Sequence, residues 1–392
     1  MKKVLVAALA VALAAFMAIP ASAFENEFGG YWRVRAFSYT DFTGDDSGAA
    51  NYQAVDSRTR LYYTAKFSDD LKFVNKFEFD TTWGDNNGGD IGSDGTGIFK
   101  IKNSYVDFNI GEVYNFKIGS QGATIGRGFV FDDDFSGVVI TGTYGDIEVP
   151  FYFIKIEEGG VGKDMDDSDL SAFSVAPVFK SGDMTINPYI FYVNQKATET
   201  HVFDLGVDFD MSMSNRTVWA TLIYQGGSFE MGTKDYDVSA FLAALGVEGN
   251  FDSVSIHGQA FYASGDDKAD DKIKNFQDLG GQAYSWSEIM GEGTFDIEIS
   301  NGSCGPQVSN IMAFNLGASI SPMDKVTLGA DLWYASLVEG DDKDLGTELD
   351  LSASYEVMEN LQLDVIAAYL FAGDATGKED PFELGLQLSL SF

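Results

Sequence analysis

The sequence is poor in the residues on which disulfide frameworks, metal sites and most active sites depend. It has one cysteine, two histidines and seven prolines among 392 residues. The single cysteine, Cys304, excludes an intramolecular disulfide. His201 and His257 have no catalytic motif and no metal-ligand spacing around them. We therefore expect a protein that is not an enzyme and that has no cofactor.

Basic residues are also scarce. The chain has 25 Lys and Arg against 60 Asp and Glu, which makes its formal net charge -35 at pH 7. A nucleic-acid-binding protein needs a basic surface, so this balance argues against nucleic acid as a partner. It is typical instead of a surface that repels anions or collects divalent cations.

Long apolar runs are absent beyond the N-terminus. There, Lys2 and Lys3 precede an apolar run over residues 4–19, and Ala21-Ser22-Ala23 forms an A-x-A-like cleavage site. This order is typical of a secretory signal peptide, so we predict a cleaved signal over residues 1–23 and one domain over residues 24–392. The alternative is a membrane anchor, but a transmembrane helix needs about 20 apolar residues.

The sequence is rich in alternating segments. From Phe382 to Phe392 every second residue is apolar, and Glu383, Gln387 and Ser389 are among the residues between them. Side chains two apart share one face of a strand, so this segment has one continuous apolar face. Its length suits a lipid-facing strand, which needs about 9–11 residues. The same pattern recurs upstream, for example over residues 203–211, 326–334 and 348–357.

The breaks between these segments are of two alternating kinds. Short polar turns, such as residues 68–70, 145–146 and 213–215, alternate with generally longer acidic or glycine-rich loops. Outer-membrane barrels have short periplasmic turns and longer extracellular loops. We therefore predict an all-β fold, a transmembrane antiparallel up-and-down β-barrel of about 18 strands, with 16 as the alternative. The rival fold is a secreted soluble β-sandwich or β-helix. That fold requires neither an apolar outer face on nearly every strand nor two distinct classes of loop.

The closing run from Pro381 to Phe392, with its terminal aromatic residue, resembles the assembly signal of outer-membrane barrels. The whole chain resembles the Gram-negative outer-membrane porin superfamily, and residues 347–355 and 361–373 are similar in style to alginate-export-type barrels. The porin resemblance implies a homotrimer, whereas alginate-export barrels are implied to work alone and to have a strongly basic lumen. The second half of this chain departs from a basic lumen, so alginate does not carry over as its substrate.

The resemblance also implies location and partners. We expect an outer-membrane protein, exported through the periplasm, that contacts lipid and lipopolysaccharide and is recognised by the barrel-assembly machinery through Phe392. Acidic extracellular loops suggest weakly held divalent cations. The spacing of Asp85, Asp90 and Asp94 nevertheless matches no calcium-binding loop, so a solvated loop is the simpler interpretation.

Charged residues on the polar faces of the strands are the candidate pore lining. The basic candidates are Arg33, Arg35, Arg58, Arg60, Lys72, Lys76, Lys117 and Arg127. The acidic candidates are Glu78, Asp80, Asp132, Asp133, Asp134, Asp204, Asp208, Asp210 and Asp350. On a lipid-facing surface an arginine costs about 2–4 kcal/mol at the bilayer midplane, so the arginines must face water. Opposed walls of charge set the selectivity of a pore.

Two loops are candidates for narrowing the lumen. Residues 122–134 contain Gly126 and Gly128, which let the backbone fold inward, and three aspartates that can face the arginines. The alternative for this loop is an ordinary solvated surface. Residues 265–307 exceed the usual loop length and include apolar residues such as Phe276 and Trp286, so we predict that they pack as a lid or as a partial plug.

These features together predict a passive diffusion channel for small hydrophilic solutes and ions, with an overall preference for cations. The alternative is a substrate-specific channel for an acidic oligosaccharide or another anion, guided by the basic wall.

The soluble rival makes a different prediction about extraction. We expect the protein to remain with the membrane fraction after osmotic shock and to need detergent for release, because its apolar strand faces contact lipid. Immunoblotting of the fractions checks this. Release by osmotic shock without detergent would instead favour the secreted soluble fold.

Overall fold

The computed structural model describes residues 24–42, 51–84, 98–159, 168–232, 234–268, 272–296 and 307–392. The predicted signal peptide over residues 1–23 lies outside these described residues, as do Asp85, Asp90 and Asp94. Within the described part, no helix is both long enough and apolar enough to span a membrane.

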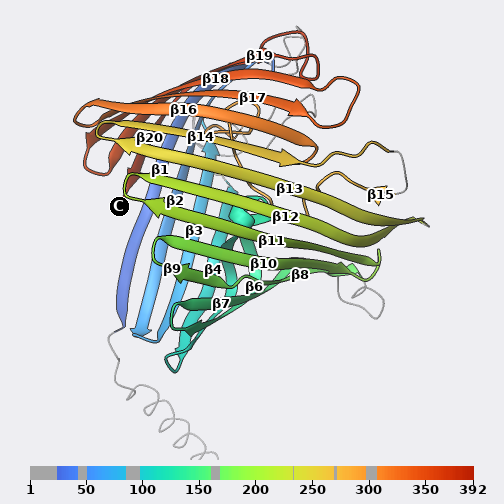
Figure 1. Ribbon diagram of the computed structural model, residues 1–392. Helices are drawn as coiled ribbons and strands as arrows, with labels where there is room; N and C mark the ends of the chain where they lie inside the picture. Colours follow the sequence, from blue (N-terminus) through green and yellow to red (C-terminus); the bar gives the residue numbers. More distant parts are fainter. Residues whose placement is uncertain are drawn as a thin grey trace, which may run out of the picture.

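The described residues form one sheet that closes into a barrel (Figure 1). The strands are β1 (Glu25–Thr40), β2 (Tyr52–Ser68), β3 (Leu71–Thr82), β4 (Ile98–Ile110), β5 (Tyr114–Ile125), β6 (Phe131–Tyr144), β7 (Ile147–Glu157), β8 (Leu170–Val175), β9 (Val178–Ser181), β10 (Met184–Gln195), β11 (Thr200–Met213), β12 (Arg216–Met231), β13 (Lys234–Phe251), β14 (Val254–Ala263), β15 (Lys272–Ile273), β16 (Ile311–Met323), β17 (Val326–Leu337), β18 (Asp344–Met358), β19 (Leu361–Ala372) and β20 (Phe382–Ser391). A short 3-10 turn, η1 (Gly126–Gly128), connects β5 and β6.

The barrel wall has eighteen strand positions in the described residues, although twenty strands are present. The strands β8 and β9 share one position, because both pair with β7 on one side and with β10 on the other. Pro177 lies between them and has no N–H to donate to a neighbouring strand. The two-residue strand β15 pairs in parallel with β13 and belongs to the segment before β16. The prediction of about 18 antiparallel strands is therefore confirmed.

The alternating pattern decides which side chains of each strand face outward and which face the lumen. On β20, Leu384 and Leu386 are 46% and 44% exposed on the outer face, whereas Glu383, which precedes Leu384, is 1% exposed on the inner face. Leu222, Leu245 and Leu316 on other strands are more than half exposed. A water-soluble fold would bury such residues, whereas a bilayer accepts them as its contact surface.

The barrel closes through antiparallel pairing of β1 with β20, which places Arg33 opposite Ser389 and Arg35 opposite Gln387. The last residue completes this seam, because Gly30 N donates to Phe392 O at 2.7 Å and Phe392 N donates to Gly30 O at 3.1 Å. Every backbone group of a membrane-spanning strand needs such a partner. This pairing of the last strand with the first closes the barrel that the sequence predicted.

Gly30 has no room for a side chain at this seam. A Cβ on Gly30 would lie 2.4 Å from the Phe392 ring and 2.6 Å from Arg60 O. We expect Gly30→Ala to destabilise the barrel by about 1–3 kcal/mol through overpacking. The temperature at which the folded, SDS-resistant form is lost in gel electrophoresis measures this effect. Gly258→Ala is the control, because its nearest heavy atom would be 3.1 Å away; equal loss in both variants would contradict the prediction.

Candidate functional site

The predicted basic residues of the first strands line the lumen as ion pairs with acids of neighbouring strands. Arg58 Nε lies 2.6 Å from Asp80 Oδ1, and Arg60 Nε lies 2.6 Å from Glu78 Oε2. Glu78 is 2% exposed between these two arginines. The charges of this wall are therefore largely compensated locally, and the arginines are held in fixed positions.

The other predicted basic residues differ in their partners. Lys72 pairs with Asp107 at 3.2 Å, and Lys76 lies over the ring of Tyr62 at 5.4 Å from its centroid. Lys117 lies half-buried on β5, with Asp107 and Val139 as its register partners. Lys76 has no carboxylate partner among the described residues, so it offers a cationic group to a solute.

The hairpin of β5 and β6 leaves the barrel wall at its tip. Pairing of β5 with β4 ends at Ser120, and pairing of β6 with β7 ends at Ser136. The two strands continue to pair only with each other, as far as Ile125 and Phe131. The segment predicted as a loop over residues 122–134 is thus the tip of a β-hairpin that folds into the lumen.

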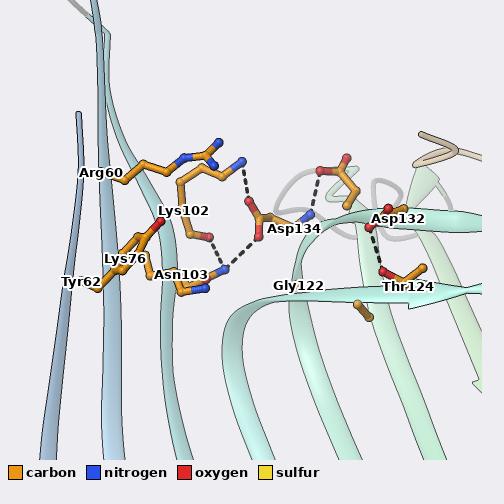
Figure 2. A pocket seen from close by; sticks show the side chains of 11 residues that line it. Arg60, Tyr62, Lys76, Lys102, Asn103, Gly122, Thr124, Asp132 and Asp134 are labelled. Atoms are coloured by element: carbon orange, nitrogen blue, oxygen red, sulfur yellow. Dashed lines mark hydrogen bonds and ion pairs between the residues drawn. The ribbon is translucent and has the colours of Figure 1, made fainter. Parts of the chain in front are cut away.

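The outer edge of this tip faces the basic wall across a pocket of about 550 Å³. Figure 2 shows Arg60, Lys76 and Lys102 on the side of the wall and Asp132 and Asp134 on the side of the hairpin. Asp134 accepts hydrogen bonds from Asn103 at 2.8 Å and pairs with Lys102 at 2.6 Å, while Asp132 accepts from Thr124 at 2.9 Å. Asp133 also lines this pocket. The structure therefore brings the aspartates of the hairpin close to basic side chains of the wall, as the sequence suggested.

Arg127 lies at the tip itself and reaches a different part of the wall. Its guanidinium donates to Asp210 at 2.8 Å and lies over the ring of Trp219 at 4.6 Å from the centroid. Its backbone has a φ of 56°, between the two glycines of η1, which also have positive φ. Arg127 thus fixes the hairpin tip to β11 and β12, rather than standing free in the pore.

A second inward element is the segment over residues 272–296. Its contacts are with lumen-facing side chains: Tyr284 donates to Gln259 at 2.6 Å, and Asp296 pairs with Arg35 at 2.8 Å. It also meets the hairpin, because Asp132 N donates to Gly281 O at 2.7 Å. The predicted choice between a lid and a partial plug is resolved for these described residues, which lie inside the barrel as a partial plug.

Glu348 on β18 anchors this plug. Its carboxylate accepts from Ile289 N at 2.7 Å, Met290 N at 2.8 Å and Ser287 Oγ at 3.1 Å. Glu348 is fully buried. It supplies the acceptor that these plug groups would otherwise lack in the barrel interior.

The predicted acidic residues of the later strands have structural partners in most cases. Asp204 is 1% exposed and accepts from Gln225 at 2.9 Å, and Asp208 accepts from Thr221 at 2.7 Å. Asp350 is different: Glu288 N donates to its Oδ2 at 3.4 Å, whereas its Oδ1 is buried without a donor among the described residues. The carboxylate of Glu383 likewise has no donor there.

Sequence reasoning missed Lys100 and Lys102, which also lie at the basic wall. The register between β3 and β4 shifts between Lys76 and Phe77, so that Lys76 faces Asn103 while Phe77 faces Ile101. Such a bulge exchanges the inward and outward positions along β4. A strict alternation of inward and outward residues therefore cannot assign the faces of β4 along its whole length. The two lysines, spaced two residues apart, were nevertheless a visible sign that one face of this strand is basic. The described residues contain no group of three or more His, Cys, Asp or Glu placed to hold a metal ion.

A model of the alginate-export family matches residues 163–385. Among solved structures, OccK8 (OprE) of Pseudomonas aeruginosa has a TM-score of 0.61 at 12% identity, over 94% of this chain and 98% of that chain. OpdK of the same organism, solved with vanillate, has a TM-score of 0.63 at 9% identity, over 93% and 98%. OccAB1 of Acinetobacter baumannii has 0.62 at 12%, over 94% and 96%. No curated protein matches. At these identities the solved structures support the barrel fold.

The anchoring role of Glu348 leads to a prediction about the plug. Glu348→Gln replaces one of the two acceptor oxygens by an NH2 group, which faces backbone donors instead of accepting from them. We expect the plug to be less stably held by about 1–3 kcal/mol, the cost of leaving a buried donor unpaired. Limited proteolysis within residues 272–296 and the noise of single-channel current measure the loosening.

Glu356→Gln on the same strand is the matched control, since Glu356 is exposed and pairs with Lys325 at 3.5 Å near the turn. Unchanged proteolysis and current noise in Glu348→Gln would show that the carboxylate does not hold the plug.

Proposed function

Because the chain belongs to the alginate-export family, we propose that it is a passive diffusion channel for small hydrophilic solutes and ions with an overall preference for cations. The protein is an outer-membrane β-barrel of the porin type, a channel and not an enzyme.

The unequal pairing of the two signs of charge carries the proposed cation preference. Arg35, Arg58 and Arg60 each have a carboxylate partner within 2.6 Å. On the hairpin side of the first pocket, Asp132 and Asp133 are exposed and form no ion pair with a Lys or Arg among the described residues. Basic side chains that are paired with carboxylates contribute little to the electrostatic potential of the lumen. Acidic side chains without a basic partner, together with a net charge of -35, raise the local concentration of cations.

A second candidate function is a substrate-specific channel for an acidic oligosaccharide or another anion. Arg60, Lys76 and Lys102 converge on one pocket, and Lys76 has no carboxylate partner in the described chain. The family is described by alginate export, and OpdK was solved with the carboxylate vanillate, which adds support from relatives in sequence or fold. Aspartates on the opposite side of the same pocket weigh against this candidate.

The partners expected from the sequence remain proposals. Phe392 is 60% exposed at the end of the seam, where the barrel-assembly machinery would reach it. Lipopolysaccharide, with divalent cations at the acidic loops, and association as a homotrimer are proposed on the resemblance to porins. The mass of the detergent-solubilised protein distinguishes a trimer from a monomer.

Planar-bilayer recording under a salt gradient tests the proposed selectivity. We expect a reversal potential that indicates cation preference, and a cation-to-anion permeability ratio that falls roughly two- to fivefold in the double variant Asp132→Asn, Asp134→Asn, because the pocket loses its acidic side. Asp146→Asn is the matched control, since Asp146 is exposed in the turn at the other end of β6.

Clear anion preference of the unaltered channel would overturn the proposal and favour the second candidate. That candidate requires that reversing the charge of Arg58 and Arg60 changes the flux of some anionic solute. It fails if no flux changes in those variants.

A further inference from the structure

A second pocket of about 420 Å³ lies between the plug and the inner face of the later strands. It is formed by inner faces of the adjacent strands β14 and β16 to β19, and by plug residues within 285–294. His257, Asn315 and Asp350 lie on the strand side, and Trp286 and Glu288 lie on the plug side. The selectivity argument above makes no use of this cavity.

The pocket holds hydrogen-bond acceptors that lack donors. Asn315 uses its Nδ2 group to donate to Asp331 at 2.9 Å, and its Oδ1 is then left without a donor among the described residues. Asp350 Oδ1 is in the same state, and both side chains are only 9% exposed. Buried acceptors without partners are costly, so a ligand that brings donors is favoured here.

The charge of the pocket is also uncompensated. None of the described residues that line it is Lys or Arg. His257 Nε2 lies 2.6 Å from Asp331 Oδ1, so the single histidine is already engaged. Burial raises the pKa of the Glu288 carboxyl, although Thr294 N and Oγ1 donate to it at 2.7 and 3.0 Å, so a nearby cation would favour its ionised form. Glu288 and Asp350 thus favour a positive ligand.

The aromatic residues of the pocket indicate what kind of cation fits. Trp286 and Trp333 meet edge to face with ring centroids 5.1 Å apart, and both line the cavity. Indole rings accept an organic cation through their π faces and pack against an apolar body. A metal ion finds no group of three or more ligating side chains in the described chain. An organic amine, by contrast, can use acceptors, carboxylates and rings together.

We propose that this pocket is a binding subsite for the ammonium group of a small organic amine that passes through the lumen. The inference rests on the proposed channel function and names one class of solute for it. The ammonium group donates to Asp350 Oδ1 and Asn315 Oδ1, while the body of the amine lies against the tryptophans. The basic wall and this subsite then give the two pockets of the lumen opposite preferences.

Block of potassium current by benzylammonium tests the subsite. We expect concentration-dependent block by benzylammonium and much weaker block by benzyl alcohol, which has the same ring without the charge. Asp350→Asn should weaken the block about tenfold, the usual effect of losing one charge-assisted hydrogen bond. Asn315→Leu should weaken it several-fold without changing the net charge, which separates a local contact from a change in the overall field.

Asp364→Asn is the matched control. Asp364 accepts from Ser354 Oγ at 2.6 Å on β19 and does not line the pocket, so the block should change by less than about twofold. Tryptophan fluorescence of the detergent-solubilised barrel, titrated with benzylammonium, gives a second readout that does not depend on conduction. The SDS-resistant folded band shows that each variant has folded.

Equal block by benzylammonium and benzyl alcohol, or block that is unchanged in both Asp350→Asn and Asn315→Leu, would overturn the subsite and leave the cation-preferring channel standing. Anion preference in the salt gradient, with block by benzylammonium intact, would overturn the proposed selectivity and leave the subsite standing.

Discussion

Pairing of β1 with β20 is the constraint on which the rest of this structure depends. A strand edge exposed to lipid would leave its backbone donors and acceptors without partners, and hydrocarbon offers none. Closing the sheet through Gly30 and Phe392 removes that edge. Closure also sets which face of every strand contacts lipid. The enrichment of the lumen in charged residues follows, because charge is not tolerated on the outer face.

Two segments, the tip of the β5–β6 hairpin and the plug, then lie in the lumen, and their backbone donors and acceptors need hydrogen-bond partners there. In the hairpin tip, β5 and β6 continue to pair with each other. In the plug, backbone N–H groups donate to side chains of the barrel wall, chiefly to Glu348. The buried carboxylate of Glu348 therefore serves as an anchor for the plug. As a consequence, many charged residues that look like pore lining are engaged in fixed ion pairs, and the remaining space is divided into two pockets with different chemistry.

Some of the site could be predicted because its signals are local. The three aspartates at 132–134 lie within one hairpin whose glycines permit the inward turn, so their approach to the basic wall was accessible to sequence reasoning. Lys102 and Asn103 were not, because a bulge in β4 exchanges the faces of the strand at that point. The role of Glu348 was hidden for another reason: its partners are near residue 289, about sixty positions earlier in the chain.

The sequence by itself determined the barrel, the number of its strands, the phase of the closing strand and the positions of the short turns. These depend on an alternation of period two and on turn residues, which act between neighbours in the chain. Only the tertiary structure decided which charges neutralise each other, that the segment over residues 272–296 is a plug, and that a pocket without basic residues lies beside it. Those features arise from contacts across the lumen, such as Arg35 with Asp296, which exist only after the barrel has closed.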